Sequence, residues 1–210
     1  TAFESTLLDA ILFLEEEKGS KLLIGNVAEN SEYTYNVDSC VGNFKDDEIS
    51  SSELLNSNTK GSVCGEGAAM FIVSSSKENA LCELVDVHQF TYPEEGTIRE
   101  RAIQFLEKNN MSSNDIDSLV LGFSGDIRTD FWYTNLMNLF LDVTIYSYKN
   151  LVGEYPTSSG FATWLSAHIL MGKEIPPNAI YKQSNRTTRN ILIYNNYLAI
   201  QHGFILLKTV

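Results

Sequence analysis

The order of apolar and polar residues along the chain predicts helices and strands from the first residues onward. Residues 4–17 carry apolar side chains at helical spacing and end at an acidic, glycine-terminated stretch, which predicts an amphipathic helix. Residues 22–25 form a short apolar run typical of a buried strand. The stretch from Glu29 to Lys60 is polar, and it predicts a surface loop with one helical turn at residues 53–55.

The remainder of the chain alternates between strand-like and helix-like patterns. We expect strands at 68–74, 80–90, 118–122, 143–146, 190–197 and 199–210, and helices at 97–108, 130–141 and 158–171. Strands that alternate with helices are typical of a layered α/β fold. The last two strands are adjacent in sequence, so we expect them to pair antiparallel.

Composition narrows the class of protein further. The 210 residues are 43% hydrophobic, so a sizeable core can form, and the net charge of −12 disfavours nucleic acid and anionic membranes as partners. Three cysteines without a C-x-x-C pair make neither a disulfide framework nor a zinc site, and free thiols fit a reducing cytoplasm. No apolar run approaches the roughly 20 residues of a membrane span. We therefore expect a cytoplasmic protein without a metal ion or cofactor.

Four short segments resemble motifs of the ketoacyl-acyl-carrier-protein synthases. Residues 1–5 (T-A-F-E-S) stand where that family has T-A-C-S-S, and residues 65–69 resemble its G-E-G-A strand. Residues 153–160 (G-E-Y-P-T-S-S-G) stand where the family has G-H-x-x-G-A-A-G, and residues 172–177 resemble its G-x-I-P-P. The order of the expected elements agrees with this resemblance over essentially the whole chain.

The resemblance implies a thiolase-like fold layered α/β/α/β/α. The chain would cover the part from the nucleophile turn to the carboxyl terminus, with residues 1–78 in the amino-terminal half and 79–210 in the carboxyl-terminal half. The leading strands of the first sheet would then lie outside this chain. We expect the strands near Lys21 and Ala68 to expose unpaired edges and apolar faces, which upstream residues or another chain would complete.

The family places a cysteine nucleophile at the start of a helix, where the helix dipole and backbone donors favour the thiolate. The matching residue here is Phe3, whose ring cannot be acylated. A two-residue slip would place Ser5 there, but a serine without a base is a poor nucleophile. The simpler interpretation of Phe3 is a core aromatic beside the first helix.

Two family histidines that donate hydrogen bonds to the thioester carbonyl also lack counterparts. The first would lie in the turn Gly122–Asp126, which contains Ser124 but no histidine, and the second would fall at Glu154. A carboxylate there would repel a malonyl group and oppose formation of the enolate. The alternative is that Glu154 faces water in a loop. The turn also resembles a serine nucleophile elbow, with the second glycine one residue early.

The terminal hairpin would carry the gating loop of the family. Ala199 stands at the position of the gating aromatic, and Ile200 and Gln201 replace a flexible pair of glycines, which suggests a fixed loop. His202 is the one histidine expected near the site, and a structural role fits it better than a catalytic one.

These features together imply a non-catalytic ketosynthase-like subunit, of which the chain-length factor is the family precedent. Its partner would be a catalytically competent ketosynthase in a heterodimer, or a second copy of itself, in fatty-acid, aryl-polyene or polyketide assembly. An acyl carrier protein, being acidic, would engage the partner rather than this acidic chain. Two alternatives stay open: a diverged acyltransferase or hydrolase that uses Ser124 or Ser5, and a binding scaffold unrelated to acyl-chain assembly.

Overall fold

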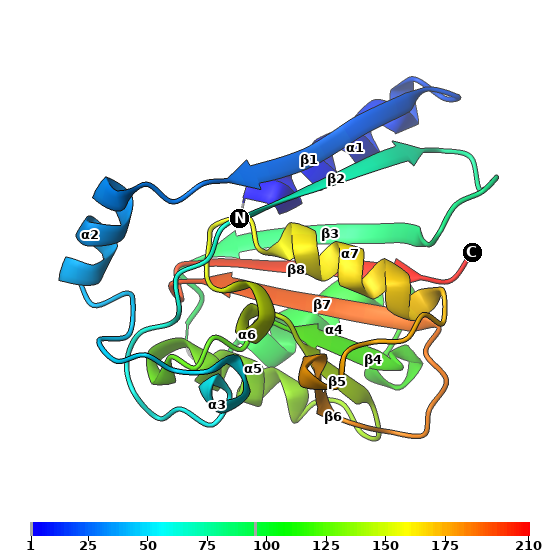
Figure 1. The fold of residues 1–210 in the computed structure, drawn as a ribbon. Helices are drawn as coiled ribbons and strands as arrows, with labels where there is room; N and C mark the ends of the chain where they lie inside the picture. The colour runs from blue at the N-terminus through cyan, green and yellow to red at the C-terminus, as the bar shows by residue number, and fades with distance from the viewer. Residues whose placement is uncertain (1, 95) are drawn as a thin grey trace.

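The computed structural model describes residues 2–94 and 96–210, which form a two-stranded and a six-stranded sheet with helices between and beside them (Figure 1). The helices are α1 (Ala2–Glu16), α2 (Glu32–Cys40), α3 (Ser51–Leu54), α4 (Ile98–Lys108), α5 (Ile127–Met137), α6 (Lys149–Val152) and α7 (Ser159–Leu170), with 3-10 turns at Ser113–Asp115 and Pro177–Ala179. The strands are β1 (Lys21–Ala28), β2 (Gly67–Ser74), β3 (Glu83–Thr91), β4 (Ser118–Leu121), β5 (Thr144–Ser147), β6 (Ile180–Lys182), β7 (Asn190–Tyr197) and β8 (Gln201–Lys208).

The six-stranded sheet has the order β3-β8-β7-β4-β5-β6. Strand β4 pairs parallel with β5 and β7, whereas β3, β8 and β6 join antiparallel. The expected antiparallel pair at the carboxyl terminus is confirmed, since β7 and β8 pair along their full length. The central strands β4, β5, β7 and β8 are buried on both faces, which explains their continuous apolar runs.

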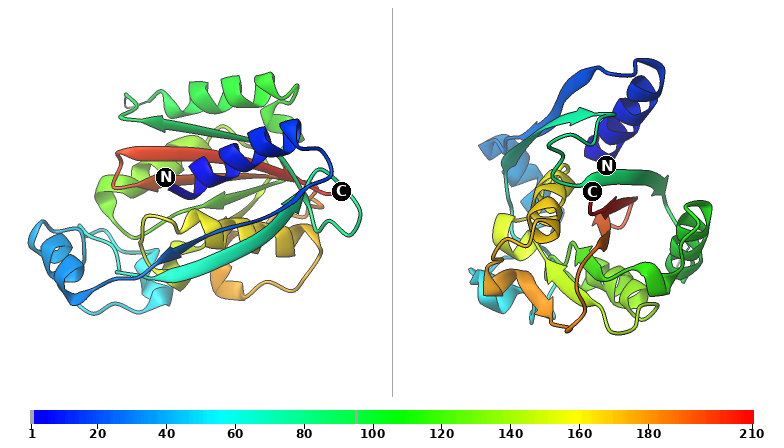
Figure 2. Two further views of the ribbon diagram at one scale, coloured as in Figure 1. Left: turned by 90° about the horizontal axis from the view of Figure 1, so that it is seen from above. Right: turned by 90° about the vertical axis from the view of Figure 1, so that its right-hand side faces the viewer.

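Two hydrophobic cores lie on opposite faces of this sheet. Helices α4 and α5 pack on one face, around Phe105, Trp132 and Phe204. Helices α1 and α7 pack on the other, around Phe3, Leu165 and Ile193. The β1–β2 ribbon lies on the far side of α1 and α7, as the right-hand view of Figure 2 shows. The described residues therefore form four successive layers, α/β/α/β, and the expected layered α/β fold class is confirmed.

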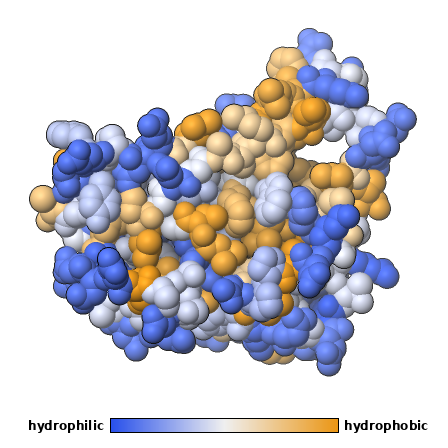
Figure 3. All heavy atoms as spheres, viewed as in Figure 1, coloured by the Kyte–Doolittle hydropathy of each residue, from blue (hydrophilic) through white to orange (hydrophobic). Residues whose placement is uncertain are grey.

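The outer face of the β1–β2 ribbon is apolar and exposed. Leu23 and Ile72 are directly cross-paired and are 74% and 75% exposed, and Val27 and Met70 lie on the same face. The opposite face sends Ile24 and Phe71 into the core with α1 and α7. Figure 3 shows apolar residues gathered over this upper part of the molecule. The exposed apolar face expected near Lys21 and Ala68 is thus present.

Several boundaries differ from the expected ones for local reasons. The stretch 29–60 is not only loop, since Ser31 caps α2 by accepting a hydrogen bond from the Thr34 amide. Helix α5 begins at Ile127 rather than at residue 130, because the Asp126 carboxylate accepts from the Arg128 amide and caps the helix there. The pairing of β3 with β8 shifts register between Leu84 and Asp86, and this irregularity interrupts the simple alternation expected along residues 80–90.

In the part of the chain that the structure describes, no helix is both long and apolar enough to cross a membrane.

Candidate functional site

Phe3 lies in the first turn of α1, fully buried. Its ring centroid is 5.6 Å from that of Phe71, in the core between the two sheets. The next residue, Glu4, is also buried and accepts a hydrogen bond from Ser159 Oγ at 2.9 Å, which ties α1 to the start of α7. Burial raises the pKa of Glu4. The helix start that would present a nucleophile therefore holds an aromatic ring and a buried carboxyl group.

Ser5, the alternative nucleophile, faces outward from α1. Its hydroxyl donates to Gln89 Oε1 at 3.0 Å. Among the described residues, the hydrogen bond of the Ser5 hydroxyl goes to this amide oxygen and not to a histidine.

The turn after β4 buries Ser124 instead of presenting it. The Ser124 amide donates to Asp130 Oδ1 at 2.9 Å, and its hydroxyl lies 3.3 Å from both Asp130 Oδ1 and Thr129 Oγ1. Asp130 also accepts from the Gly125 amide at 2.8 Å. Burial raises the pKa of Asp130. The strand and helix expected on either side of this turn are present. The Asp130 carboxylate accepts hydrogen bonds from the backbone of the turn, so it stabilises the turn instead of acting as a catalytic base.

Gly122 opens this turn in a crowded polar environment. A Cβ at this position would collide with the hydroxyls of Tyr133 and Tyr148 and with the side chain of Lys149. The Tyr148 hydroxyl donates to Asn195 Oδ1 at 2.8 Å, and Tyr133 OH accepts from the Asn196 amide at 3.0 Å. Buried tyrosine hydroxyls and a lysine therefore crowd the start of the turn in which the resemblance places the first histidine.

Glu154 forms an ion pair with Lys149 at 2.8 Å, with side chains 8% and 1% exposed respectively. Lys149 also donates to the carbonyl oxygen of Asn196 at 2.7 Å. Burial raises the pKa of Glu154, and the neighbouring ammonium opposes that shift. The alternative that Glu154 faces water is therefore wrong. The Lys149 ammonium supplies a compensating charge beside the carboxylate that was expected to repel a malonyl group.

The 63–65 segment fixes the backbone of Glu154. The Glu154 amide donates to the Val63 carbonyl at 2.7 Å, and the Gly65 amide donates to the Glu154 carbonyl at 3.1 Å. A Cβ on Gly65 would overlap the backbone of Val152 and Gly153, so only glycine permits this approach. The glycine-rich motif at residues 65–67 thus positions Glu154.

The β7–β8 hairpin turns through Leu198 and Ala199, both with φ of 54°. Neither is glycine, so each adopts a left-handed conformation that L-residues disfavour by roughly 1–2 kcal/mol. The Ala199 amide donates to Asn196 Oδ1 at 3.2 Å, and the Ile200 amide donates to the Tyr197 carbonyl at 3.0 Å. Ala199 presents only a methyl group where the resemblance places a gating aromatic.

His202 is buried on β8 at the edge of this hairpin. Its Nδ1 lies 2.8 Å from the Tyr194 hydroxyl, and its ring stacks on Phe90 and meets Trp132 edge-on. Burial lowers the pKa of His202 to about 4, so the ring stays neutral near pH 7. These contacts place His202 among core aromatic side chains. The hydrogen bond of its Nδ1 goes to Tyr194 and not to Lys149 or Glu154.

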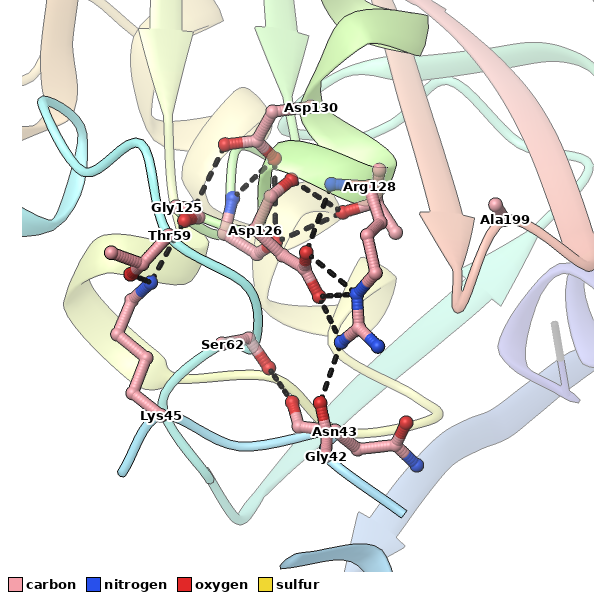
Figure 4. Close-up of polar contacts among 12 residues, drawn as sticks. Gly42, Asn43, Lys45, Thr59, Ser62, Gly125, Asp126, Arg128, Asp130 and Ala199 are labelled. Carbon is pink, nitrogen blue, oxygen red and sulfur yellow. Dashed lines mark hydrogen bonds and ion pairs between the residues drawn. The ribbon is translucent and has the colours of Figure 1, made fainter. Parts of the chain in front are cut away.

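Side chains on both sides of the β4–α5 turn fasten the 29–62 segment to it (Figure 4). Lys45 Nζ donates to Ser57 Oγ, Thr59 Oγ1 and the Gly125 carbonyl, each at 2.9 Å. Arg128 pairs with Asp126 and donates to the Gly42 carbonyl, each at 2.6 Å. The segment is thus pinned at two points over the turn that carries Ser124.

A cavity of ≈310 Å³ lies between this segment, the 154–157 loop and the tip of the hairpin. Glu154 and Tyr197 line it, together with side chains of α2 and of the 62–65 stretch. Among the described residues no group of histidine, cysteine and carboxylate side chains could hold a metal ion.

The sequence matches no protein-family model and no curated protein. The fold does match solved structures. The AntDE:AntF complex, a type II polyketide synthase acyl-carrier protein with its ketosynthase bound to the hexaketide, gives a TM-score of 0.80 at 14% identity, over 100% of this chain and 61% of that one. The ishigamide ketosynthase/chain length factor gives 0.79 at 14% identity, over 100% and 59%. A beta-ketoacyl synthase from Burkholderia phymatum gives 0.77 at 16% identity, over 99% and 59%.

These likenesses define the class of fold: the chain has the thiolase-like fold of the ketosynthases and chain length factors. It spans about 60% of the length of those three solved chains. At such low identity the likeness shows the fold alone.

Sequence reasoning missed Lys149, the residue that changes the chemistry of Glu154. Lys149 is the one charged residue between Asp142 and Glu154 and lies five residues before the glutamate, and this was the available signal. A fully buried lysine requires a partner, so Glu154 could have been paired with it.

Proposed function

We propose that this protein is a non-catalytic, ketosynthase-like subunit of the chain-length-factor type. The observation that carries the proposal is the buried phenyl ring of Phe3 at the start of α1, where the resemblance places the nucleophilic cysteine. A phenyl ring offers no lone pair to attack a thioester, so no acyl-enzyme can form at this position.

The hydrogen bonds of Glu154 and Lys149 support the same proposal. Decarboxylative condensation needs hydrogen-bond donors aimed at a developing enolate. Here the second histidine position holds a carboxylate, whose nearest charge, Lys149, already donates to Glu154 and to the Asn196 carbonyl. Two of the three ammonium protons are thereby committed within the protein.

The proposed role is to support a partner ketosynthase in fatty-acid, aryl-polyene or polyketide assembly, in the cytoplasm. The partner, in a heterodimer or a self-dimer, would carry the condensation and would receive the acyl carrier protein. In this proposal residues 1–78 belong to the amino-terminal half of the fold and residues 79–210 to the carboxyl-terminal half. Ketosynthase complexes with a chain length factor and with a carrier protein occur among the similar structures.

Covalent labelling tests the absence of a nucleophile. We expect incubation with an acyl thioester or a fluorophosphonate to leave the intact mass of the protein unchanged, while an active ketosynthase in a parallel reaction gains the acyl group from the thioester. Label on Ser124 or Ser5, abolished by Ser124→Ala or Ser5→Ala, would favour the acyltransferase or hydrolase instead. The buried Ser124 and the Gln89-bound Ser5 are the reasons we expect none.

Co-purification from the native host separates the subunit from an unrelated scaffold. A ketosynthase should be recovered in stoichiometric amount with the tagged protein. Recovery of other partners without a ketosynthase would contradict the proposal even if no covalent label forms.

A further inference from the structure

The cavity beside Glu154 has a lining that the proposed function does not use. It lies between the end of β1, the 29–44 stretch, the 154–157 loop and the hairpin tip. Three carboxylate residues line it, Glu29, Asp38 and Glu154, and no lysine, arginine or histidine is among its lining residues. Lys149 pairs with Glu154 but is not a lining residue, so Glu29 and Asp38 have no basic neighbour in the lining.

Aromatic side chains share the cavity with these carboxylates. Phe44, Tyr155 and Tyr197 line it. Burial, followed by the negative charges of Glu154 and Asp38, raises the pKa of Tyr197 to about 12. Tyr197, Glu154 and Asp38 thus line the same cavity, which brings an aromatic ring and two carboxyl groups to one site.

Glu154 adds an observation that points to a ligand. Its Oε2 accepts from Lys149, but its Oε1 is buried and has no hydrogen-bond partner. An unsatisfied buried carboxylate oxygen loses the free energy of a hydrogen bond, and this loss is larger for a charged group than for a neutral one. A ligand that donates a hydrogen bond would recover part of it.

From this lining we infer that the cavity binds a small organic ammonium with an apolar, aromatic-compatible body. The ammonium donates to the carboxylates at the polar end of the cavity, and the faces of Tyr and Phe rings stabilise the cation and cover the apolar part. An anionic group of the same size is disfavoured, since every charged side chain in the lining is a carboxylate. This inference stands on the cavity alone and does not require the proposed partner.

The charge of the ligand is the variable that tests the inference. Calorimetric titration at low salt would compare three molecules of similar shape: phenethylammonium, 2-phenylethanol and 3-phenylpropanoate. We expect saturable binding of phenethylammonium, at least about tenfold tighter than the alcohol, and no binding of the propanoate. Equal affinity for the ammonium and the alcohol, binding of the propanoate, or no saturable binding of phenethylammonium would overturn the inference.

Two variants locate the site without disturbing the buried ion pair. Asp38→Asn keeps an oxygen acceptor for Asn43, which donates to Asp38 Oδ1 at 3.0 Å, and Glu29→Gln changes an exposed side chain. Each should weaken phenethylammonium binding about three- to tenfold, whereas Asp9→Asn, the same charge change on the exposed surface of α1, should leave it unchanged. Binding that all three variants weaken equally would show a general charge effect and overturn the assignment to this cavity.

Discussion

Glu154, which stands where the resemblance places a histidine, is buried together with Lys149. An unpaired carboxylate at this depth would be destabilised by several kcal/mol. The ion pair and the Asn196 carbonyl let both charges remain buried. The same contacts close the position to a substrate carbonyl, because the donor that could serve it is already engaged. Under the proposed non-catalytic role, the contacts that stabilise the buried pair are also those that occupy the donor.

His202 makes a prediction about pH. Its pKa is lowered to about 4 in the fold by burial, against 6.5 for a solvated histidine, so the unfolded chain binds the proton first. The stability that this neutral ring contributes is complete above pH 6.5 and is lost as pH falls from 6.5 to 4. The full loss is about 3 kcal/mol.

Urea denaturation of wild type and His202→Asn at a series of pH values checks this. The wild-type advantage in free energy of unfolding should be constant above pH 7 and shrink by about 3 kcal/mol toward pH 4. Buried carboxyls such as Glu154 and Asp130, whose pKa values are raised, titrate in both proteins and cancel in the difference. A difference independent of pH would show that His202 is protonated in the fold as readily as in the unfolded chain.

The role of a single residue was predictable from sequence when the chemistry of its side chain alone determines that role. Phe3 cannot be a nucleophile in any fold. The environment of Glu154 depended on Lys149, the Asn196 carbonyl and the 63–65 segment, which are brought together only by the tertiary structure. The φ values of Leu198 and Ala199 were equally hidden, because neither residue type signals a left-handed turn.

Elements with strong periodicity were predicted well, and those held by polar contacts were not. The apolar runs of β4, β7 and β8 identified buried strands within a residue or two. Helix α2 buries none of its residues, so its sequence lacks an apolar face and predicts a loop. The segment around it is placed by Lys45 and Arg128, whose partners lie some 80 residues away along the chain.

Lys45 therefore carries a prediction about the 29–62 segment. Lys45→Met removes three hydrogen bonds from an ammonium and should lower the free energy of local opening by about 2 kcal/mol. Hydrogen exchange should quicken roughly thirtyfold at the amides of Ser62 and Ile127, which donate to Asn43 and Thr59 in this region. Lys60→Met, an exposed lysine of the same segment, is the matched control. Unchanged exchange in Lys45→Met would mean that the segment is held by other contacts.

At the scale of the whole molecule, the β1–β2 ribbon leaves one apolar face exposed. Its inner face packs on α1 and α7, while Leu23, Val27, Met70 and Ile72 face outward. The similar solved chains extend well beyond the matched region, which covers only about 60% of their length. We propose that further polypeptide, from the same chain or from a partner, covers this face in the working protein.

The 210-residue chain by itself should consequently self-associate and bind a hydrophobic dye through this face, since contiguous exposed apolar surface drives association. Replacing both members of a cross-strand pair, as in Leu23→Lys with Ile72→Lys, should suppress dye fluorescence several-fold and shift sedimentation toward the monomer. Both side chains point away from the core, so the melting temperature should change little. Leu141→Lys changes an 81% exposed leucine outside both sheets and should leave association intact. A wild-type chain that sediments as a monomer without binding dye would mean that this ribbon needs no cover.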